Sequence, residues 1–419
     1  MRWWSAIGLL VAVRLAIPLA AYADSGSKLP GIPAFVRPDA YGGLSGDATG
    51  FYAGAREFMA VWGRMPRALF ALDALFVLAA ASAIVLLWRR RPDRRAWLVP
   101  ATLFAVALAL CAGIHYMKPT GAAVIGWPLV WSVPMLPYRV LGSLGPGAAW
   151  DIGTAVSLLF VALTVVAVAY LGRNATGREW IGIAAAAFWT AWPVLVGLIA
   201  GHRAWANNQW DIDVGLHNYD EPLSTLLVTA AAALLLSPRL TPMRLALAGC
   251  ALSLATSVKV SNALIAGLVL VIVAVRHRRA ALPYLAGALA FAPVVLVYWP
   301  KSYPKLYHNA NSWPHDAFDV HHVVSSWTHS SIFTPHTLAI VVPLAAIGVL
   351  GVLRPWQLAL VLAFLLINPV FYSFYANTSQ HSRFLYASLP ELFVLWAAGI
   401  EVIRRVALAR SLLARSFAR

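Results

Sequence analysis

The chain has 419 residues, of which 61% are hydrophobic and 11% are charged. A soluble domain carries about 25% charged residues, so this composition excludes both a water-soluble globular protein and a disordered chain. It predicts an all-α, polytopic membrane protein that uses lipid as its solvent. The two cysteines, Cys111 and Cys250, both lie in apolar stretches, which excludes a disulfide framework or a cysteine metal site.

The apolar stretches are long enough to cross a bilayer many times, because a membrane-spanning helix needs about 20 apolar residues. One stretch, 245–275, is interrupted by polar residues between Thr256 and Asn262, and we interpret it as a hairpin of two helices. The sequence therefore predicts a single transmembrane domain, 1–419, with about 12 transmembrane or re-entrant helices. The other expected segments are 3–23, 68–88, 96–116, 150–171, 180–200, 222–237, 281–299, 337–353, 356–376 and 385–403.

Basic residues are distributed unevenly among the loops. More than half of the 32 lysines and arginines fall, together with Arg2, in short loops on one side and in the C-terminal tail. The positive-inside rule then predicts that both termini are cytoplasmic, in a multi-pass protein of the plasma (inner) membrane. These charges face anionic membrane lipids, so the net charge of +16 does not indicate a nucleic-acid partner.

Four long loops lie on the opposite, extracytoplasmic side in this orientation: 24–67, 117–149, 201–221 and 300–336. All of the 11 histidines except His277 map to that side or to the outer ends of spans. An aromatic belt at the membrane interface would explain the tryptophans there, but it would not explain clustered histidines and acids. We therefore expect any chemistry to take place on the extracytoplasmic side.

The first of these loops, 24–67, predicts short juxtamembrane helices. Asp47 can cap a helix that begins near it, and Tyr52 and Arg56 would form an i, i+4 pair on that helix. An ordinary N-cap role is the structural alternative for Asp47.

The third loop ends in an acidic cluster. Asp211, Asp213, Asp220 and Glu221 lie within a short stretch that leads into a span. Glu221 and the proline after it fit a helix start, with the acid near the positive end of the helix dipole. Capping needs only one acid, so the cluster is also a candidate site for a cation or for hydroxyl groups.

Two basic residues stand out near the outer ends of spans. From Arg244 on the inner side to Lys259 is roughly 22 Å of helix, which places the ammonium group deep in the membrane or just emerging from it. Intramembrane cations usually mark a function, most simply an anionic partner, although a snorkelling lysine is the alternative. Arg383 begins the last span, where it can hold a lipid phosphate or act as an interface anchor.

The last long loop, 300–336, is rich in histidine. His315, Asp316, Asp319 and His321 are candidate ligands of a divalent metal ion. No ligand spacing specifies a metal, so the ion stays an open candidate and no other cofactor is expected.

Three segments together resemble the GT-C class of integral-membrane glycosyltransferases, which use polyprenyl-phosphate-linked sugars. The likeness extends to the protein-mannosyltransferase and lipid A aminoarabinose branches, but here the first loop has a lone Asp47 rather than an Asp-Glu pair, and no large soluble C-terminal domain follows. The exact substrates of those branches therefore do not transfer. The segments are Gly46-Asp47-Ala48-Thr49-Gly50-Phe51-Tyr52, the run from Leu245 to Lys259, and Arg383-Phe384-Leu385-Tyr386 with Leu389-Pro390.

The resemblance implies a GT-C-like fold and an enzyme that moves a sugar from a polyprenyl-phosphate donor to an acceptor hydroxyl on the extracytoplasmic face. By analogy, Asp47 is the general base, and Lys259 and Arg383 bind the donor phosphate. Supporting roles fall to Arg56 and His381 at the phosphate, and to Asp220, Glu221, Asp211 and Asp213 for the acceptor or an ion.

The sequence is also compatible with other functions. An O-antigen-ligase- or polymerase-type enzyme would share the fold class. A transporter or flippase for a lipid-linked or acidic solute is the alternative from another class, followed by a structural or assembly role. Transporters often show matched broken helices in both halves, and we find only one interrupted hairpin, 245–275. The sequence names neither the sugar nor the acceptor.

Overall fold

The computed structural model describes a chain that is helical and contains no strand within the described residues; one isolated bridge pairs Phe318 with Tyr375. The prediction of an all-α protein is therefore confirmed for these residues. The described residues are 2–23, 51–56, 71–72, 74–75, 78–79, 81–83, 85–86, 96, 98–117, 126–137, 145–200, 220–278, 281–289, 318–328, 335–352, 354–375 and 381–417.

The labelled helical elements follow one another along the chain. They are α1 (Trp3–Ala23), α4 (Leu98–Met117), α5 (Gly126–Met135), α7 (Pro146–Thr176), α8 (Glu179–Ala200), α11 (Glu221–Leu235), α12 (Pro242–Val258), α13 (Asn262–His277), α14 (Ala281–Leu289), α16 (His322–Thr328), α17 (Pro335–Val349), α18 (Pro355–Ser373), α19 (His381–Phe384), the 3₁₀-helix η5 (Tyr386–Ser388) and α20 (Leu389–Phe417).

Membrane-compatible helices are present among them. Three stretches, Trp3–Ala20, Gly147–Thr176 and Pro355–Ser373, are long and apolar enough to cross a bilayer. Shorter apolar helices include α11, α12 and α13. These features fit an α-helical membrane protein, since helices satisfy their backbone hydrogen bonds internally.

The predicted break in 245–275 is confirmed. The helix α12 ends at Val258, Lys259 is extended, and α13 begins at Asn262. The polar residues of the break form bonds that fix it, because the Asn262 amide donates to Ser224 Oγ (2.8 Å) and to the Ala255 carbonyl (2.9 Å). This turn therefore joins α12 and α13 to the start of α11.

Glycines allow the helices of the bundle to approach closely. A Cβ atom at either partner of three crossings would collide with backbone of the facing helix. Small residues at such crossings are typical of membrane helices, where association depends on close packing. The pairs are Gly172 with Gly182 between α7 and α8, Gly249 with Gly287 between α12 and α14, and Gly348 with Gly399 between α17 and α20.

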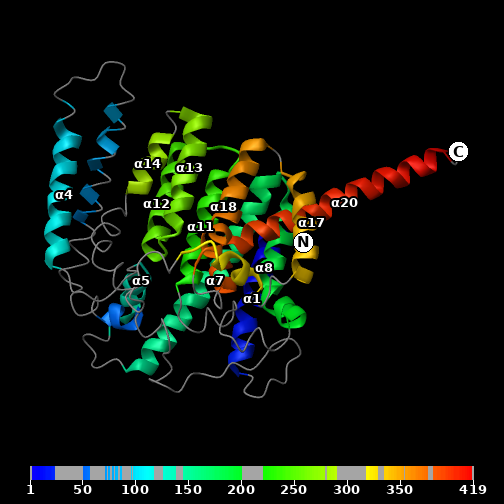
Figure 1. Ribbon diagram of the computed structural model, residues 1–419, viewed down its shortest axis with the longest axis horizontal. Helices are drawn as coiled ribbons and strands as arrows, with labels where there is room; N and C mark the ends of the chain where they lie inside the picture. The colour runs from blue at the N-terminus through cyan, green and yellow to red at the C-terminus, as the bar shows by residue number, and fades with distance from the viewer. Residues whose placement is uncertain are drawn as a thin grey trace.

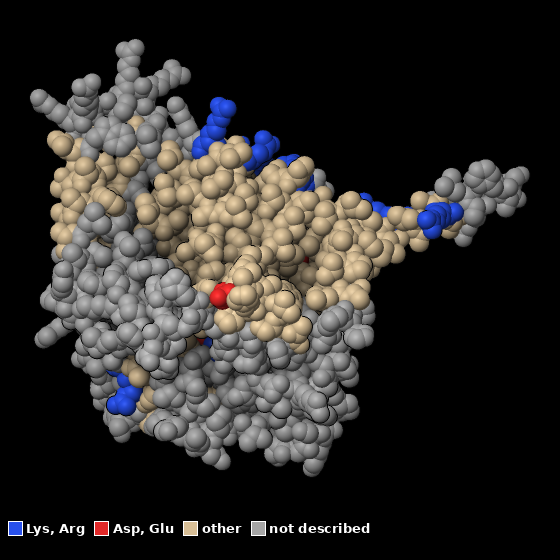
Figure 2. All heavy atoms as spheres, viewed as in Figure 1, with Lys and Arg blue, Asp and Glu red and all other residues tan. Residues whose placement is uncertain are grey.

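The two ends of the bundle differ in charge. The helix α13 has 16 residues, about 24 Å of length, and it runs from Asn262 to a basic end at Arg276 and Arg278. Exposed Arg239 and Arg354 flank neighbouring helices at this same end. Lys and Arg side chains are visible along the upper edge of the bundle and on α20, which extends away from the other helices (Figure 1, Figure 2).

Candidate functional site

Four charged side chains are buried together at the end of the bundle where α11 starts and α12 ends. They are Asp220, Glu221, Lys259 and Arg383, whose side chains are 5%, 2%, 12% and 4% exposed. We call them the charged cluster. Buried charges are costly unless they are paired, so their burial indicates that each one depends on the others.

One carboxylate oxygen lies at the centre of the charged cluster. Glu221 Oε1 accepts a hydrogen bond from Lys259 Nζ (2.6 Å) and another from Arg383 Nε (2.6 Å). Asp220 Oδ1 lies 3.9 Å from Lys259 Nζ and 3.8 Å from Arg383 Nη2. The structure thus brings together four of the residues predicted from the sequence, from three separate segments.

Two aromatic rings cover the cations. Tyr372 and Phe384 stack with their ring centroids 4.5 Å apart. Lys259 Nζ lies 5.0 Å from the centroid of Phe384 and 5.8 Å from that of Tyr372. Cation–π attraction therefore adds to the ion pairs. The Tyr372 hydroxyl is in turn 3.0 Å from Ser261 Oγ.

Two carboxylate oxygens of the charged cluster have unused capacity to accept hydrogen bonds. When both carboxylates are ionised, Asp220 Oδ1 and Glu221 Oε2 are buried and have no hydrogen-bond donor among the described residues. Leaving a buried acceptor unsatisfied costs about 1–3 kcal/mol, and more for a charged group. These atoms can therefore accept from a hydroxyl group or bind a cation.

The protonation of Asp220 sets the net charge of the cluster. Burial and the neighbouring charge of Glu221 raise the pKa of Asp220 to about 7. Burial alone would lower the pKa of Lys259, but the Glu221 and Asp220 carboxylates outweigh it, and the pKa is raised. The cluster is therefore neutral when Asp220 is ionised and carries one positive charge when Asp220 is protonated.

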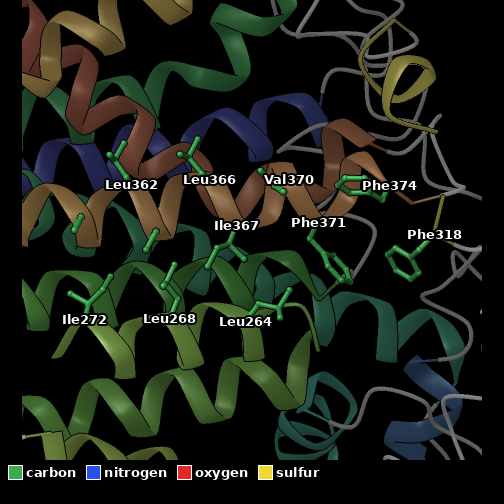
Figure 3. A pocket seen from close by; sticks show the side chains of 12 residues that line it. Leu264, Leu268, Ile272, Phe318, Leu362, Leu366, Ile367, Val370, Phe371 and Phe374 are labelled. Atoms are coloured by element: carbon green, nitrogen blue, oxygen red, sulfur yellow. The ribbon is translucent and has the colours of Figure 1, made fainter. Parts of the chain in front are cut away.

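An apolar groove of about 870 Å³ lies between α13 and α18 (Figure 3). It follows the two helices lengthwise, and several lining residues are partly exposed, including Leu268 (40%), Leu366 (47%) and Val370 (57%). One end is formed by Phe371 and Phe374, which flank Tyr372 in sequence. The Phe371 ring contacts the Tyr372 ring (centroids 5.1 Å apart), which in turn covers Lys259, so one aromatic residue separates this end of the groove from the charged cluster.

A short helix at 51–56 packs near the same site. Tyr52 belongs to a buried apolar cluster with Leu223 and Val258, the near neighbours in sequence of Glu221 and Lys259. Arg56 is exposed and lies over the Tyr52 ring at 5.7 Å. Among the described residues, no ion pair joins Arg56 to the charged cluster.

The remaining predicted residues are separate from the cluster or outside the described part. His381 starts α19, two residues before Arg383, but its side chain is outside the described set. Asp319 and His321 form an exposed pair 4.0 Å apart. Within the described residues, no three His, Cys, Asp or Glu side chains are grouped to hold a metal ion. Asp47, Asp211, Asp213, His315 and Asp316 all lie outside the described residues.

The aromatic cover and the groove were not predicted from the sequence. Tyr372, Phe384 and Ser261 contact the cluster, but aromatic and hydroxyl residues are so common at the ends of spans that they give no specific signal. The sequence feature that comes closest to predicting this cover is Phe384, which directly follows Arg383 in the Arg383-Phe384-Leu385-Tyr386 segment.

No protein-family model, curated protein or solved structure matches this chain. Its function must therefore be argued from the chemistry of the site.

Proposed function

We propose that the protein is a GT-C-like integral-membrane glycosyltransferase that moves a sugar from a polyprenyl-phosphate donor to an acceptor hydroxyl. The observation that carries this proposal is a buried lysine–arginine pair, Lys259 and Arg383, that the ring of Tyr372 separates from one end of the apolar groove between α13 and α18. A ligand that satisfies both features has an anionic headgroup and a long apolar tail.

The two cations suit a departing phosphate. An ammonium group has three N–H donors and a guanidinium five, and the guanidinium fork matches phosphate geometry. Glu221 Oε1 accepts a bond from each and holds both side chains in place before a ligand arrives. Fixed cations of this kind stabilise the negative charge that grows on the leaving phosphate.

The groove suits the lipid tail. Its lining is apolar, and the partly exposed Leu264, Leu268 and Leu366 leave it open along its length. An isoprenoid chain can enter sideways from the bilayer and lie along α13 and α18 without exposing its surface to water. This arrangement explains why such an enzyme would be embedded in a membrane.

The transfer itself needs a base for the acceptor. The acceptor oxygen bonds to the anomeric carbon, the bond between that carbon and the phosphate oxygen breaks, and polyprenyl phosphate leaves. We assign the proton of the acceptor hydroxyl to Asp47, four residues before the helix at 51–56 that packs beside the cluster. Asp220 Oδ1 and Glu221 Oε2, which have unused acceptor capacity, would accept hydrogen bonds from hydroxyl groups or hold an ion.

The orientation follows from the charges. We propose about 12 transmembrane or re-entrant helices, with both termini in the cytoplasm of a cell whose plasma (inner) membrane contains the protein. The exposed arginines at the end of α13 would then face the cytoplasm, and the charged cluster would face outward.

The test is to offer the purified protein a panel of polyprenyl-phosphate sugars with a mixture of hydroxyl acceptors. We expect one donor to be consumed, with release of polyprenyl phosphate and formation of a glycosidic bond. Translocation of a lipid or acidic solute in liposomes, with no carrier released from any donor, would contradict the proposal and favour a transporter or flippase.

A further inference from the structure

Three arginines converge on one buried carboxylate at the basic end of the bundle. The side chain of Glu401 is 2% exposed and bonds to Arg178 in the turn between α7 and α8. It also accepts from Arg404 Nε (2.8 Å) and Arg405 Nε (2.8 Å), both on α20. One cation would neutralise this carboxylate, so the three arginines and Glu401 together carry a net charge of about +2.

The three arginine side chains that carry this excess charge are partly exposed on the surface of the protein. The side chains of Arg178, Arg404 and Arg405 are 37%, 57% and 52% exposed. Loss of solvent contact lowers the pKa of Arg178 most, and repulsion from the guanidinium groups of Arg405 and Arg404 lowers it further. A guanidinium has five N–H donors, and the bonds to Glu401 use only one or two of them on each arginine. An incoming anion would relieve the repulsion.

Apolar side chains lie beside the arginines. Trp180 is 38% exposed, and the Arg404 guanidinium carbon is 6.0 Å from the centroid of its ring. On α20, Ile400, Ile403 and Val406 are 41%, 49% and 48% exposed at a spacing of three residues. Tryptophan is typical of the membrane interface, and basic helices with apolar stripes bind there.

We propose that Arg178, Arg404 and Arg405 bind the phosphate headgroup of an anionic phospholipid, with Trp180 and the apolar stripe of α20 against its acyl chains. The phosphate oxygens accept charge-assisted hydrogen bonds from the guanidinium groups. Glu401 orients the arginines and neutralises only one of them. The site is independent of the proposed glycosyl transfer, which takes place at the other end of the bundle.

The test is native mass spectrometry of the full-length protein after removal of its lipids, titrated with phosphatidylglycerol or phosphatidylcholine. We expect one phosphatidylglycerol molecule to bind at least about tenfold more tightly than phosphatidylcholine. Each substitution, Arg404→Gln or Arg405→Gln, should weaken that binding about fivefold, the effect expected for one basic side chain at an anionic lipid surface. Glu401→Gln should strengthen it, because the substitution adds one unit of positive charge to the site.

Two controls keep the result interpretable. Arg276→Gln with Arg278→Gln removes two exposed charges from the end of α13 and should leave the preference for phosphatidylglycerol unchanged. If a single arginine substitution prevents folding, the Glu401→Gln protein still tests the proposal, because it keeps all three arginines and should bind phosphatidylglycerol more tightly. Equal affinity for the two lipids, or displacement of phosphatidylglycerol by millimolar inorganic phosphate, would overturn the proposal.

Discussion

Asp47 is the residue on which the proposed chemistry depends most. We expect Asp47→Asn to lower the rate of sugar transfer by about 100-fold or more, because general-base catalysis contributes about 10²–10⁴-fold. The rate of polyprenyl-phosphate release measures this effect. Asp39→Asn removes a charge from the same loop and is the matched control. Full activity of the Asp47→Asn protein would remove Asp47 from the mechanism.

The raised pKa of Asp220 predicts that donor binding depends on pH. Its pKa is raised to about 7, so lowering the pH through 7 protonates it and gives the charged cluster a net positive charge. A sugar-phosphodiester headgroup stays anionic throughout this range. We therefore expect the donor to bind about tenfold more tightly at pH 6 than at pH 8, the change expected when the protonated form alone binds.

The control for this experiment is Asp220→Asn, which should bind the donor equally well at both pH values. The free energy of unfolding should also decrease as the pH rises. Because the folded protein holds a proton at Asp220 that the unfolded chain releases above about pH 4, stability falls as the pH rises from about 4 to 7. A donor affinity that increases with pH would contradict the assignment.

At the scale of elements, the groove between α13 and α18 should determine selectivity for the lipid tail. Leu268 lines the groove and is 40% exposed, so Leu268→Trp would fill part of the space without replacing a buried side chain. We expect a several-fold higher KM for a long-chain donor and little change for a short-chain, water-soluble analogue, since the lost contacts are apolar.

The matched control for the groove is Leu159→Trp. Leu159 is an exposed leucine (52%) on α7 that is not among the groove residues. If both variants changed KM for both donors equally, the groove would not be the binding site for the tail.

The interrupted hairpin shows how far local sequence could predict the structure. The polar break after Thr256 predicted where α12 ends, because those side chains cannot be left in lipid without partners. The same rule could not identify the partners. Glu221 and Arg383 are 162 residues apart, and their contact depends on the packing of α11 against η5. Carboxylates and cations that the sequence assigned to separate roles therefore form one cluster.

At the scale of the whole molecule, the charge asymmetry between the two ends predicts a fixed orientation. In a variant with both native cysteines replaced, a new cysteine at Val320 should react with a membrane-impermeant thiol reagent in intact cells. One at Arg278 should react only after the membrane is permeabilised, because positive loops stay in the cytoplasm. Both positions are exposed. The reverse labelling would contradict the topology.

The central place of Glu221 Oε1 has a consequence for selectivity. The Glu221 carboxylate already binds Lys259 and Arg383. A small hydrated anion therefore has to displace or share that partner, and it gains little binding free energy by entering. Only a molecule that brings a second source of binding energy can compete, and hydrocarbon in the neighbouring groove is such a source. Free sugar phosphates would therefore be excluded by the protein's own carboxylate, even though they contain a sugar and a phosphate like the donor.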